Sequence, residues 1–154
     1  MSQAKLLLDT NIVIDYLAER EPFYPDARLL MIAGRMGEFD LWISSSQVTD
    51  LIYILSEGSK RSLLPSTLEQ LRGLRTFVNV CTVSDREIDG MLPSTWNDPE
   101  DALLFEIALR HQVDVLVTRN QKDFESPLVR AMNCTELFDW LRDERGIDYR
   151  EIAI

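Results

Sequence analysis

Four stretches of the sequence place carboxylate side chains where a strand is expected to end or a helix to begin. The first runs from Leu6 through Leu8 into Asp9, Thr10 and Asn11, so an apolar strand would end in an acid. In open α/β sheets, ligands bind beyond the carboxyl ends of the strands. Asp9 is therefore suitably placed to bind a metal ion or to act as a nucleophile, although a plain turn followed by a helix cap would have the same sequence.

The second stretch, ISSSQVTDLIYIL, leads from a short apolar run into a helix. We expect Ser46 to cap this helix, which puts Asp50 in its first turn. Asp50 and Ile54 are four residues apart and share a helix face, so the carboxylate would lie over an apolar stripe. A charge there is costly unless a cation compensates it, although interaction with the helix N-terminus alone would also explain an acid at this point.

The third stretch, NDPEDALLF, is the densest in acids. Asp98 is expected to cap a helix whose first residue is Pro99. Asp101 would then line up with Phe105 on the buried face, and Glu100 would point elsewhere.

The fourth stretch, VLVTRNQKDF, again brings polar residues to the end of an apolar strand. Thr118 ends the strand, and Asn120 and Asp123 follow it either as site residues or as turn formers. Arg119 and Lys122 are candidates for contacts with the phosphate backbone of a nucleic acid, or they are ordinary surface cations.

Together the four stretches would gather acids at one edge of a parallel sheet. Without a cation these carboxylates would repel one another and raise one another's pKa values. Oxygen ligands with no candidate His or Cys favour a hard ion such as Mg²⁺ or Mn²⁺. Hydrolysis of a phosphodiester by metal-activated water is the chemistry that fits such a site.

Apolar runs alternate with amphipathic segments, which predicts an α/β fold: a single Rossmann-like domain over residues 1–154, with its core at about 4–140 and a tail at 141–154. A central parallel sheet of four to five strands would be flanked by helices. The expected strands are Lys5–Leu8, Leu41–Ser44, Val78–Thr82, Val113–Thr118 and, more weakly, Met132–Cys134. The expected helices are Ile12–Ala18, Pro25–Gly34, Gln47–Glu57, Ser66–Phe77, Asp85–Leu92, Pro99–His111 and Thr135–Arg145. Gly34, Gly58 and Gly146 are expected to stop helices.

The formal net charge of −10 argues against nucleic-acid binding by general electrostatic attraction. It is compatible with an enzyme that gathers carboxylates around cations, and with a basic protein partner. Two cysteines without metal-ligand spacing, and no apolar run of about 20 residues, predict a cytoplasmic protein. Exposed apolar residues around Phe23, Tyr24 and Trp42 could serve a homodimer or pack internally, and the tail with Ile152 and Ile154 could dock on the domain or on a partner.

In order and approximate spacing, four segments resemble the PIN-domain family, which includes the VapC-type toxin ribonucleases of toxin–antitoxin pairs: LLLDTNIVIDYL, ISSSQVTDLIYIL, DPEDALLFEIAL and VLVTRNQKDF. The resemblance extends from about Leu6 to Phe124. It implies a Rossmann-like fold, metal-dependent cleavage of RNA and a small antitoxin partner. Carried onto this sequence, it makes Asp9, Asp50 and Asp101 the catalytic and metal-binding acids, with Asn11 and Thr118 as polar neighbours.

The sequence departs from the family pattern at two positions. The second acid is glutamate in most relatives, whereas this chain has Asp50. A fourth acid commonly follows the Thr-Arg pair, and this chain has Asn120 there. Asp98 or Asp123 could compensate as a further metal ligand. Because the acid expected at Asn120 is missing, the sequence supports one metal ion more firmly than two.

The leading hypothesis is thus a Mg²⁺- or Mn²⁺-dependent endoribonuclease, the toxin of a toxin–antitoxin module. The departure at Asn120 motivates an alternative, a catalytically degenerate PIN scaffold that binds RNA or protein. A third possibility is a phosphatase or receiver domain that uses Asp9 as nucleophile or phosphoacceptor. It ranks last because such a phosphatase would need an acid at Asn11, and a receiver would need acids at Leu7 and Leu8.

Overall fold

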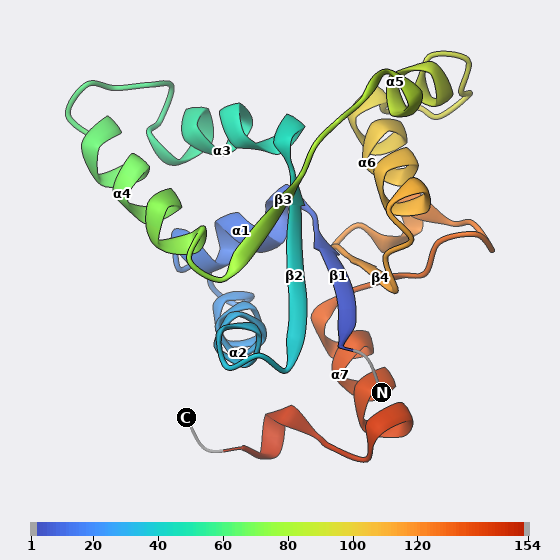
Figure 1. Cartoon of the computed structure of the whole chain (residues 1–154). Helices are drawn as coiled ribbons and strands as arrows, with labels where there is room; N and C mark the ends of the chain where they lie inside the picture. The colour runs from blue at the N-terminus through green and yellow to red at the C-terminus, as the bar shows by residue number, and fades with distance from the viewer. Residues whose placement is uncertain (1–2, 153–154) are drawn as a thin grey trace.

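Five parallel strands form the centre of the molecule (Figure 1). The computed structural model describes residues 3–152. The strands lie in the order β3-β2-β1-β4-β5, so β1 is central and pairs with β2 and β4. This arrangement confirms the predicted α/β class. The strands are β1 (Ala4–Leu8), β2 (Phe39–Ser44), β3 (Val78–Cys81), β4 (Val115–Val117) and β5 (Ala131–Met132).

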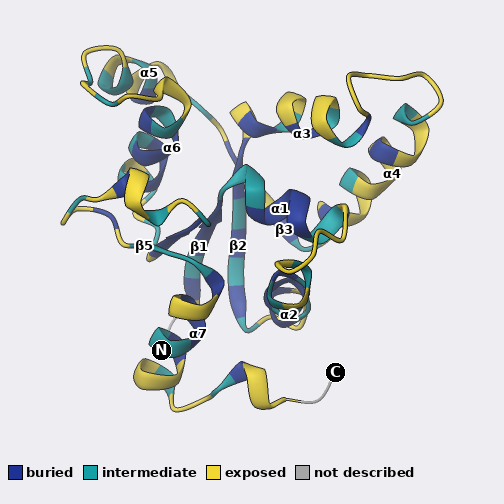
Figure 2. Ribbon diagram, turned by 180° about the vertical axis from the view of Figure 1, so that it is seen from behind, coloured by how far each residue is buried: buried dark blue, intermediate teal, exposed yellow. Residues whose placement is uncertain are grey.

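Helices cover both faces of the sheet, and the alternation of side chains along β1 shows why. Leu6 and Leu8 pack into a core with α1, α2 and α7, whereas Leu7 packs into a second core with α6. All three leucines are fully buried, as expected for the central strand of a parallel sheet (Figure 2). The helices are α1 (Thr10–Leu17), α2 (Tyr24–Arg35), α3 (Val48–Leu55), α4 (Leu64–Leu74), α5 (Asp85–Met91), α6 (Pro99–Arg110) and α7 (Cys134–Arg145).

The three glycines expected to stop helices behave differently. Gly146 ends α7 in the left-handed conformation, with φ of 71°, as predicted. Gly34 lies inside α2, so the prediction of a stop there was wrong. A Cβ atom at Gly34 would overlap the side chain of Leu41, so this glycine allows α2 to approach β2 closely. α3 ends at Leu55, and Gly58 lies in the turn that follows.

The segment after α7 packs against the protein's own sheet. Tyr149 is 2% exposed, and its ring meets the ring of Phe39 edge-on at a centroid distance of 5.1 Å. Its hydroxyl donates a hydrogen bond of 3.0 Å to the Glu38 carboxylate. Of the two alternatives for the tail, docking on the domain is therefore the one observed for Tyr149. Ile152 is exposed, and Ile154 lies outside the described residues.

The apolar residues considered for a dimer surface are only partly exposed. Trp42 is half-buried beneath Lys5, whose ammonium nitrogen lies 4.5 Å from the ring centroid, and Tyr24 stacks on Tyr16. Phe23 is 41% exposed and covers Arg119. Within residues 3–152, none of the helices is both long and apolar enough to span a membrane.

Replacing Tyr149 tests how much the docked tail stabilises the fold. Tyr149→Ala should lower the free energy of unfolding by about 3–5 kcal/mol, because a buried aromatic side chain is lost. Tyr149→Phe, which keeps the ring and removes the hydroxyl with its hydrogen bonds to Glu38 and Arg145, should lower it by about 1–2 kcal/mol. Urea denaturation measures both, with Ile152→Ala at an exposed position as the control. A Tyr149→Ala variant as stable as that control would show that the tail does not contribute.

Candidate active site

Asp9 occupies the point where β1 ends and α1 begins. One carboxylate oxygen accepts a hydrogen bond of 2.7 Å from the Thr10 amide and so caps α1. The other accepts a bond of 2.7 Å from the Thr118 hydroxyl at the end of β4. Burial raises the pKa of Asp9, while these two hydrogen bonds and the charge of Arg119 oppose the rise. The carboxylate is thus held in one orientation at the carboxyl edge of the sheet.

Thr118 and Asn11 are the polar neighbours of Asp9, whereas Asn120 approaches them only through its backbone. The fully buried Thr118 hydroxyl also accepts a hydrogen bond of 3.0 Å from the Asn120 amide. The Asn11 side chain accepts a bond of 3.3 Å from the Arg119 amide and lies 3.5 Å from the Asp9 carboxylate. Asn120 is exposed, and it contributes through its backbone.

Gln47 joins the ends of β1 and β2, a role that the sequence analysis missed. Its amide nitrogen donates bonds of 2.9 Å to the Leu8 carbonyl and 3.1 Å to the Thr10 hydroxyl. Its carbonyl oxygen accepts a bond of 2.7 Å from the Ser44 amide. Ser44 and Gln47 form a capping box around a 3₁₀ turn, so the prediction of Ser46 as the cap was wrong. The pattern Ser-x-x-Gln beginning at Ser44 was the signal that could have identified both residues.

A pocket of about 390 Å³ lies beside Asp9, between α3 and α6. It brings together the three predicted aspartates, Asp9, Asp50 and Asp101. Asp50 lies in the first turn of α3 as predicted, but its side chain is exposed rather than laid over buried apolar residues. We call this cavity the acidic pocket; its lining is Asp9, Thr10, Ser46, Gln47, Asp50, Tyr53, Ile54, Glu100, Asp101, Leu103 and Leu104.

Glu100 also lines the acidic pocket, so the expectation that it points elsewhere was wrong. Burial raises its pKa, and the charges of Asp50, Asp98 and Asp9 raise it further. The expectation failed because it used helical periodicity, which describes faces that pack along a helix. The first turn of α6 stands at the sheet edge, where neighbouring positions can both face the site. Two adjacent acids in that first turn were the available signal.

Asp101 connects the acidic pocket to a second one, which we call the outer pocket. Burial, followed by the charges of Asp98, Asp9, Asp123 and Glu100, raises the pKa of Asp101 to about 6. Asp98 caps α6 as predicted, accepting a bond of 2.8 Å from the Glu100 amide. The outer pocket is lined by Thr95, Trp96, Asn97, Asp98, Asp101, Lys122, Asp123 and Glu125.

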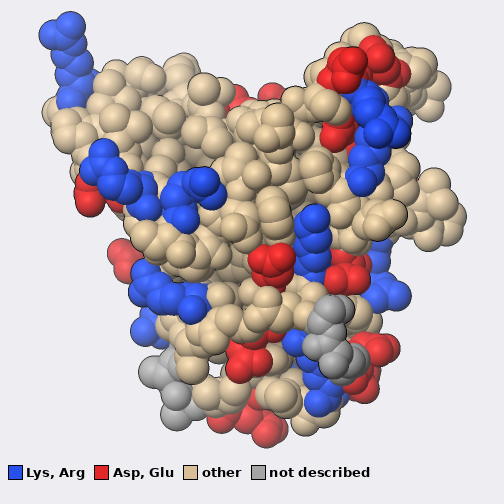
Figure 3. Space-filling model, viewed as in Figure 1, with Lys and Arg blue, Asp and Glu red and all other residues tan. Residues whose placement is uncertain are grey.

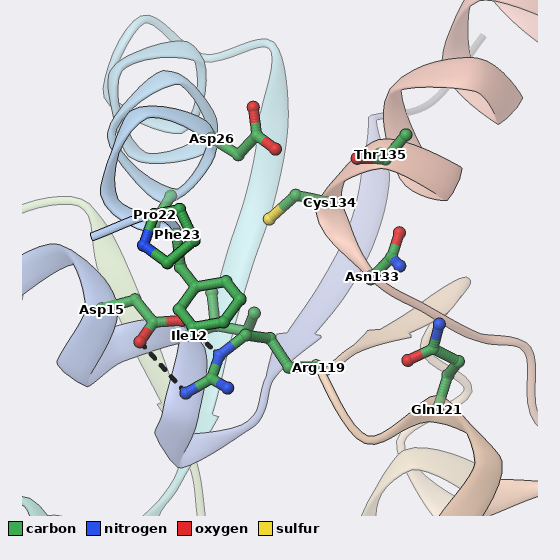
Figure 4. A pocket seen from close by; sticks show the side chains of 11 residues that line it. Ile12, Asp15, Pro22, Phe23, Asp26, Arg119, Gln121, Asn133, Cys134 and Thr135 are labelled. Atoms are coloured by element: carbon green, nitrogen blue, oxygen red, sulfur yellow. Dashed lines mark hydrogen bonds and ion pairs between the residues drawn. The ribbon is translucent and has the colours of Figure 1, made fainter. Parts of the chain in front are cut away.

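Of the two cations considered for RNA contact, Lys122 lines the outer pocket and Arg119 turns inward. The Arg119 guanidinium forms two hydrogen bonds, of 2.6 and 3.2 Å, with the buried carboxylate of Asp15 in α1. The Cζ atom of Arg119 lies 3.9 Å from the centroid of the Phe23 ring, and both side chains line a separate pocket (Figure 4). This ion pair fastens the loop after β4 onto α1, and so helps to keep Thr118 next to Asp9.

The donors of the acidic pocket suit a hard cation, because they are carboxylate oxygens, and burial together with neighbouring negative charges raises the pKa values of Glu100 and Asp101. Within residues 3–152, no three Asp, Glu, Cys or His side chains are gathered closely enough to hold an ion as they stand. The lone histidine, His111, follows α6 as predicted, and its Nε2 atom lies 3.2 Å from the Oε1 atom of Glu87.

Comparison with solved structures shows the same fold in three toxin–antitoxin complexes. VapBC2 from Rickettsia felis, bound to a fragment of its promoter DNA, matches with a TM-score of 0.61 and 19% identity, over 84% of this chain and 98% of the other. VapBC-1 from nontypeable Haemophilus influenzae matches with a TM-score of 0.61 and 22% identity, over 85% and 98%. A toxin–antitoxin complex from Klebsiella pneumoniae matches with a TM-score of 0.60 and 22% identity, over 80% of this chain and 94% of the other.

The sequence itself is similar to Ribonuclease VapC1 from Aquifex aeolicus (strain VF5). The two are 25% identical over 140 residues, which cover 88% of this chain and 94% of the relative. The family model of the PIN domain matches residues 5–122, a span that includes Asp9, Asp50, Glu100, Asp101 and Thr118. The chain therefore belongs to the PIN-domain family.

Proposed function

We propose that this protein is a divalent-metal-dependent endoribonuclease that hydrolyses RNA phosphodiester bonds. One observation carries the proposal: in a PIN-domain chain, Asp9, Asp50, Glu100 and Asp101 line a single pocket at the carboxyl edge of the sheet. Family membership favours nuclease chemistry over phosphoryl transfer to Asp9. Glu100 supplies a fourth carboxylate, which the sequence analysis had missed because it applied helical periodicity to the first turn of α6.

Mg²⁺ or Mn²⁺ would be held by Asp9, Asp101 and one or both of Asp50 and Glu100. Such an ion supplies an activated water and neutralises charge on the phosphate. Asp9 is the most constrained of the four, because Thr118 and the Thr10 amide fix its carboxylate. Asp98 and Asp123 are further metal-ligand candidates, on the far side of Asp101 in the outer pocket.

We also propose that the protein is the toxin of a toxin–antitoxin module, acting on cytoplasmic RNA and neutralised by a small antitoxin. The support is the similarity to Ribonuclease VapC1 and to chains from three toxin–antitoxin complexes. A homodimer is part of the same proposal. Expression of the chain alone should slow growth, and co-expression of the neighbouring small reading frame should restore it.

Asp9→Asn should reduce RNA cleavage by roughly 100-fold or more, because it removes a charge from the best-ordered position of the site. Asparagine keeps one oxygen to accept the bond from the Thr10 amide that caps α1, and its amide nitrogen can donate to the Thr118 hydroxyl, so the fold should persist. Cleavage of a labelled RNA with Mn²⁺ measures the effect. Asp89→Asn, at an exposed position of α5, is the matched control. Undiminished cleavage by Asp9→Asn would refute the assignment of the site.

Glu100→Gln tests whether this residue replaces the acid missing at Asn120. We expect cleavage to fall roughly 10- to 100-fold, as for Asp50→Asn, and the Mn²⁺ concentration for half-maximal activity to rise. Asp123→Asn, which removes an acid that lines the outer pocket and not the acidic pocket, should have a smaller effect. If Asp123→Asn were as damaging as Glu100→Gln, the outer pocket would belong to the metal site.

Asp101→Asn tests the repulsion in the metal-free protein. Because the pKa of Asp101 is raised from 3.8 to about 6, the folded state disfavours its ionised form. The stability that Asp101 confers when neutral is therefore lost as the pH rises from about 4 to about 6. In EDTA, Asp101→Asn should melt at a higher temperature than the wild type at about pH 8, and the difference should vanish near pH 4.

The same melting experiment separates an enzyme from a non-catalytic PIN scaffold. Adding Mn²⁺ should raise the melting temperature of the wild type more than that of Asp101→Asn, because the ion binds only the folded state. If Mn²⁺ shifted neither protein while RNA still bound, the chain would be a binding module and not a nuclease.

A further inference from the structure

The acidic pocket has an apolar part that metal binding does not explain. On α3, Tyr53 and Ile54 lie one turn beyond Asp50, and on α6, Leu103 and Leu104 lie one turn beyond Glu100. Residues three and four apart share a helix face, so each wall carries both an acid and apolar side chains. Tyr53 and Ile54 are 63% and 41% exposed, whereas large hydrophobic side chains are more often buried in the core.

The ring of Tyr53 lies near the turn that follows α3. Gly58 in that turn has φ of 84°, and a Cβ atom added to it would come no closer than 3.8 Å to the hydroxyl end of the tyrosine ring. The turn therefore approaches this end of the ring and leaves the side chain 63% exposed. Within residues 3–152, Tyr53 has no hydrogen bond through its hydroxyl and no stacked aromatic neighbour. One ring surface thus remains available beside the carboxylates.

We propose that the apolar part of the acidic pocket binds an unpaired nucleobase next to the scissile phosphate, with Tyr53 as its stacking partner. This inference rests on the proposed ribonuclease function and assigns to Tyr53 a direct contact with the substrate. Bases inside an RNA duplex are stacked on one another and unavailable, whereas unpaired bases can stack on aromatic side chains. Leu103 and Leu104 provide apolar surface on the opposite wall.

The charge of the protein favours a contact of this kind. A chain with a net charge of −10 gains little affinity for RNA from general attraction to phosphates. Stacking does not depend on the sign of the protein's charge. Cations also follow on the same arm: Lys60 and Arg61 are exposed just after the Gly58 turn, and basic side chains appear on the flank that carries α4 (Figure 3). A strand stacked on Tyr53 could extend toward them.

The test compares Tyr53→Ala with Tyr53→Phe on a single-stranded oligoribonucleotide. Tyr53→Ala should raise KM about tenfold, the scale of losing one stacked base, with a smaller change in kcat. Tyr53→Phe keeps the ring and should recover most of the loss. Leu68→Ala, at an exposed apolar position of α4, is the control. Because Tyr53 is exposed, melting temperatures should change little, which separates lost binding from lost folding.

Abasic substrates identify the stacked base. Nucleotides flanking the mapped cleavage site are replaced one at a time by abasic ones. One replacement should weaken wild-type cleavage about tenfold and leave Tyr53→Ala unaffected, since the stacking partner is already missing. Equal sensitivity of the two proteins at every position would overturn the inference, as would full activity of Tyr53→Ala.

Two further outcomes keep the proposals distinct. If the wild type cleaves no RNA with Mg²⁺ or Mn²⁺, the proposed function fails, whatever Tyr53 does. If Tyr53→Ala cleaves normally but shifts a dimer to monomer in sedimentation, Tyr53 belongs to an interface between copies, and the stacking inference alone is wrong.

Discussion

Carboxylates of like charge repel one another, and the fold has to hold several of them at one edge of its sheet. Asp9, Asp50, Glu100 and Asp101 face one pocket, and the pKa of Asp101 rises to about 6 as a result of burial and of its acidic neighbours. The surrounding hydrogen bonds oppose this repulsion. Thr118 reaches Asp9 from β4, and Gln47 joins the end of β2 to the end of β1. The ends of three neighbouring strands are thus tied together where the charges meet.

The fold and part of the site could be predicted from the sequence because both depend on local patterns. Short apolar runs alternating with amphipathic segments predict a parallel sheet, and the observed strands begin and end within a few residues of the predicted ones. An acid directly after a buried strand, as at Asp9, must lie at the carboxyl edge of that sheet. An acid in the first turn of the helix that follows a strand, as at Asp50, is expected close to the same edge. Asp101 lies in the first turn of the second helix after β3, and it also lines the pocket at this edge.

The remaining features depend on tertiary contacts that spacing does not encode. Glu100 was assigned to the wrong side because periodicity says little about a first helical turn that overhangs a sheet edge. Arg119 looked like a surface cation, yet a carboxylate 104 positions away in the sequence, Asp15, pairs with it in the interior. Gly34 was read as a helix stop, whereas its lack of a side chain lets α2 approach Leu41. In each case the deciding partner lies on a different element.

The central position of β1 has a consequence for synthesis of the protein. β1 is made first, but one of its two neighbours, β4, begins at Val115, and the hydroxyl that orients Asp9 belongs to Thr118. A nascent chain whose Thr118 has not yet emerged from the ribosome can form neither the pairing with β4 nor the hydrogen bond from this hydroxyl. Asp9, although translated early, therefore lacks its hydrogen-bond partner until one of the last strands of the sheet has emerged. Under the proposed function, such late assembly would delay cleavage of RNA until most of the chain has left the ribosome.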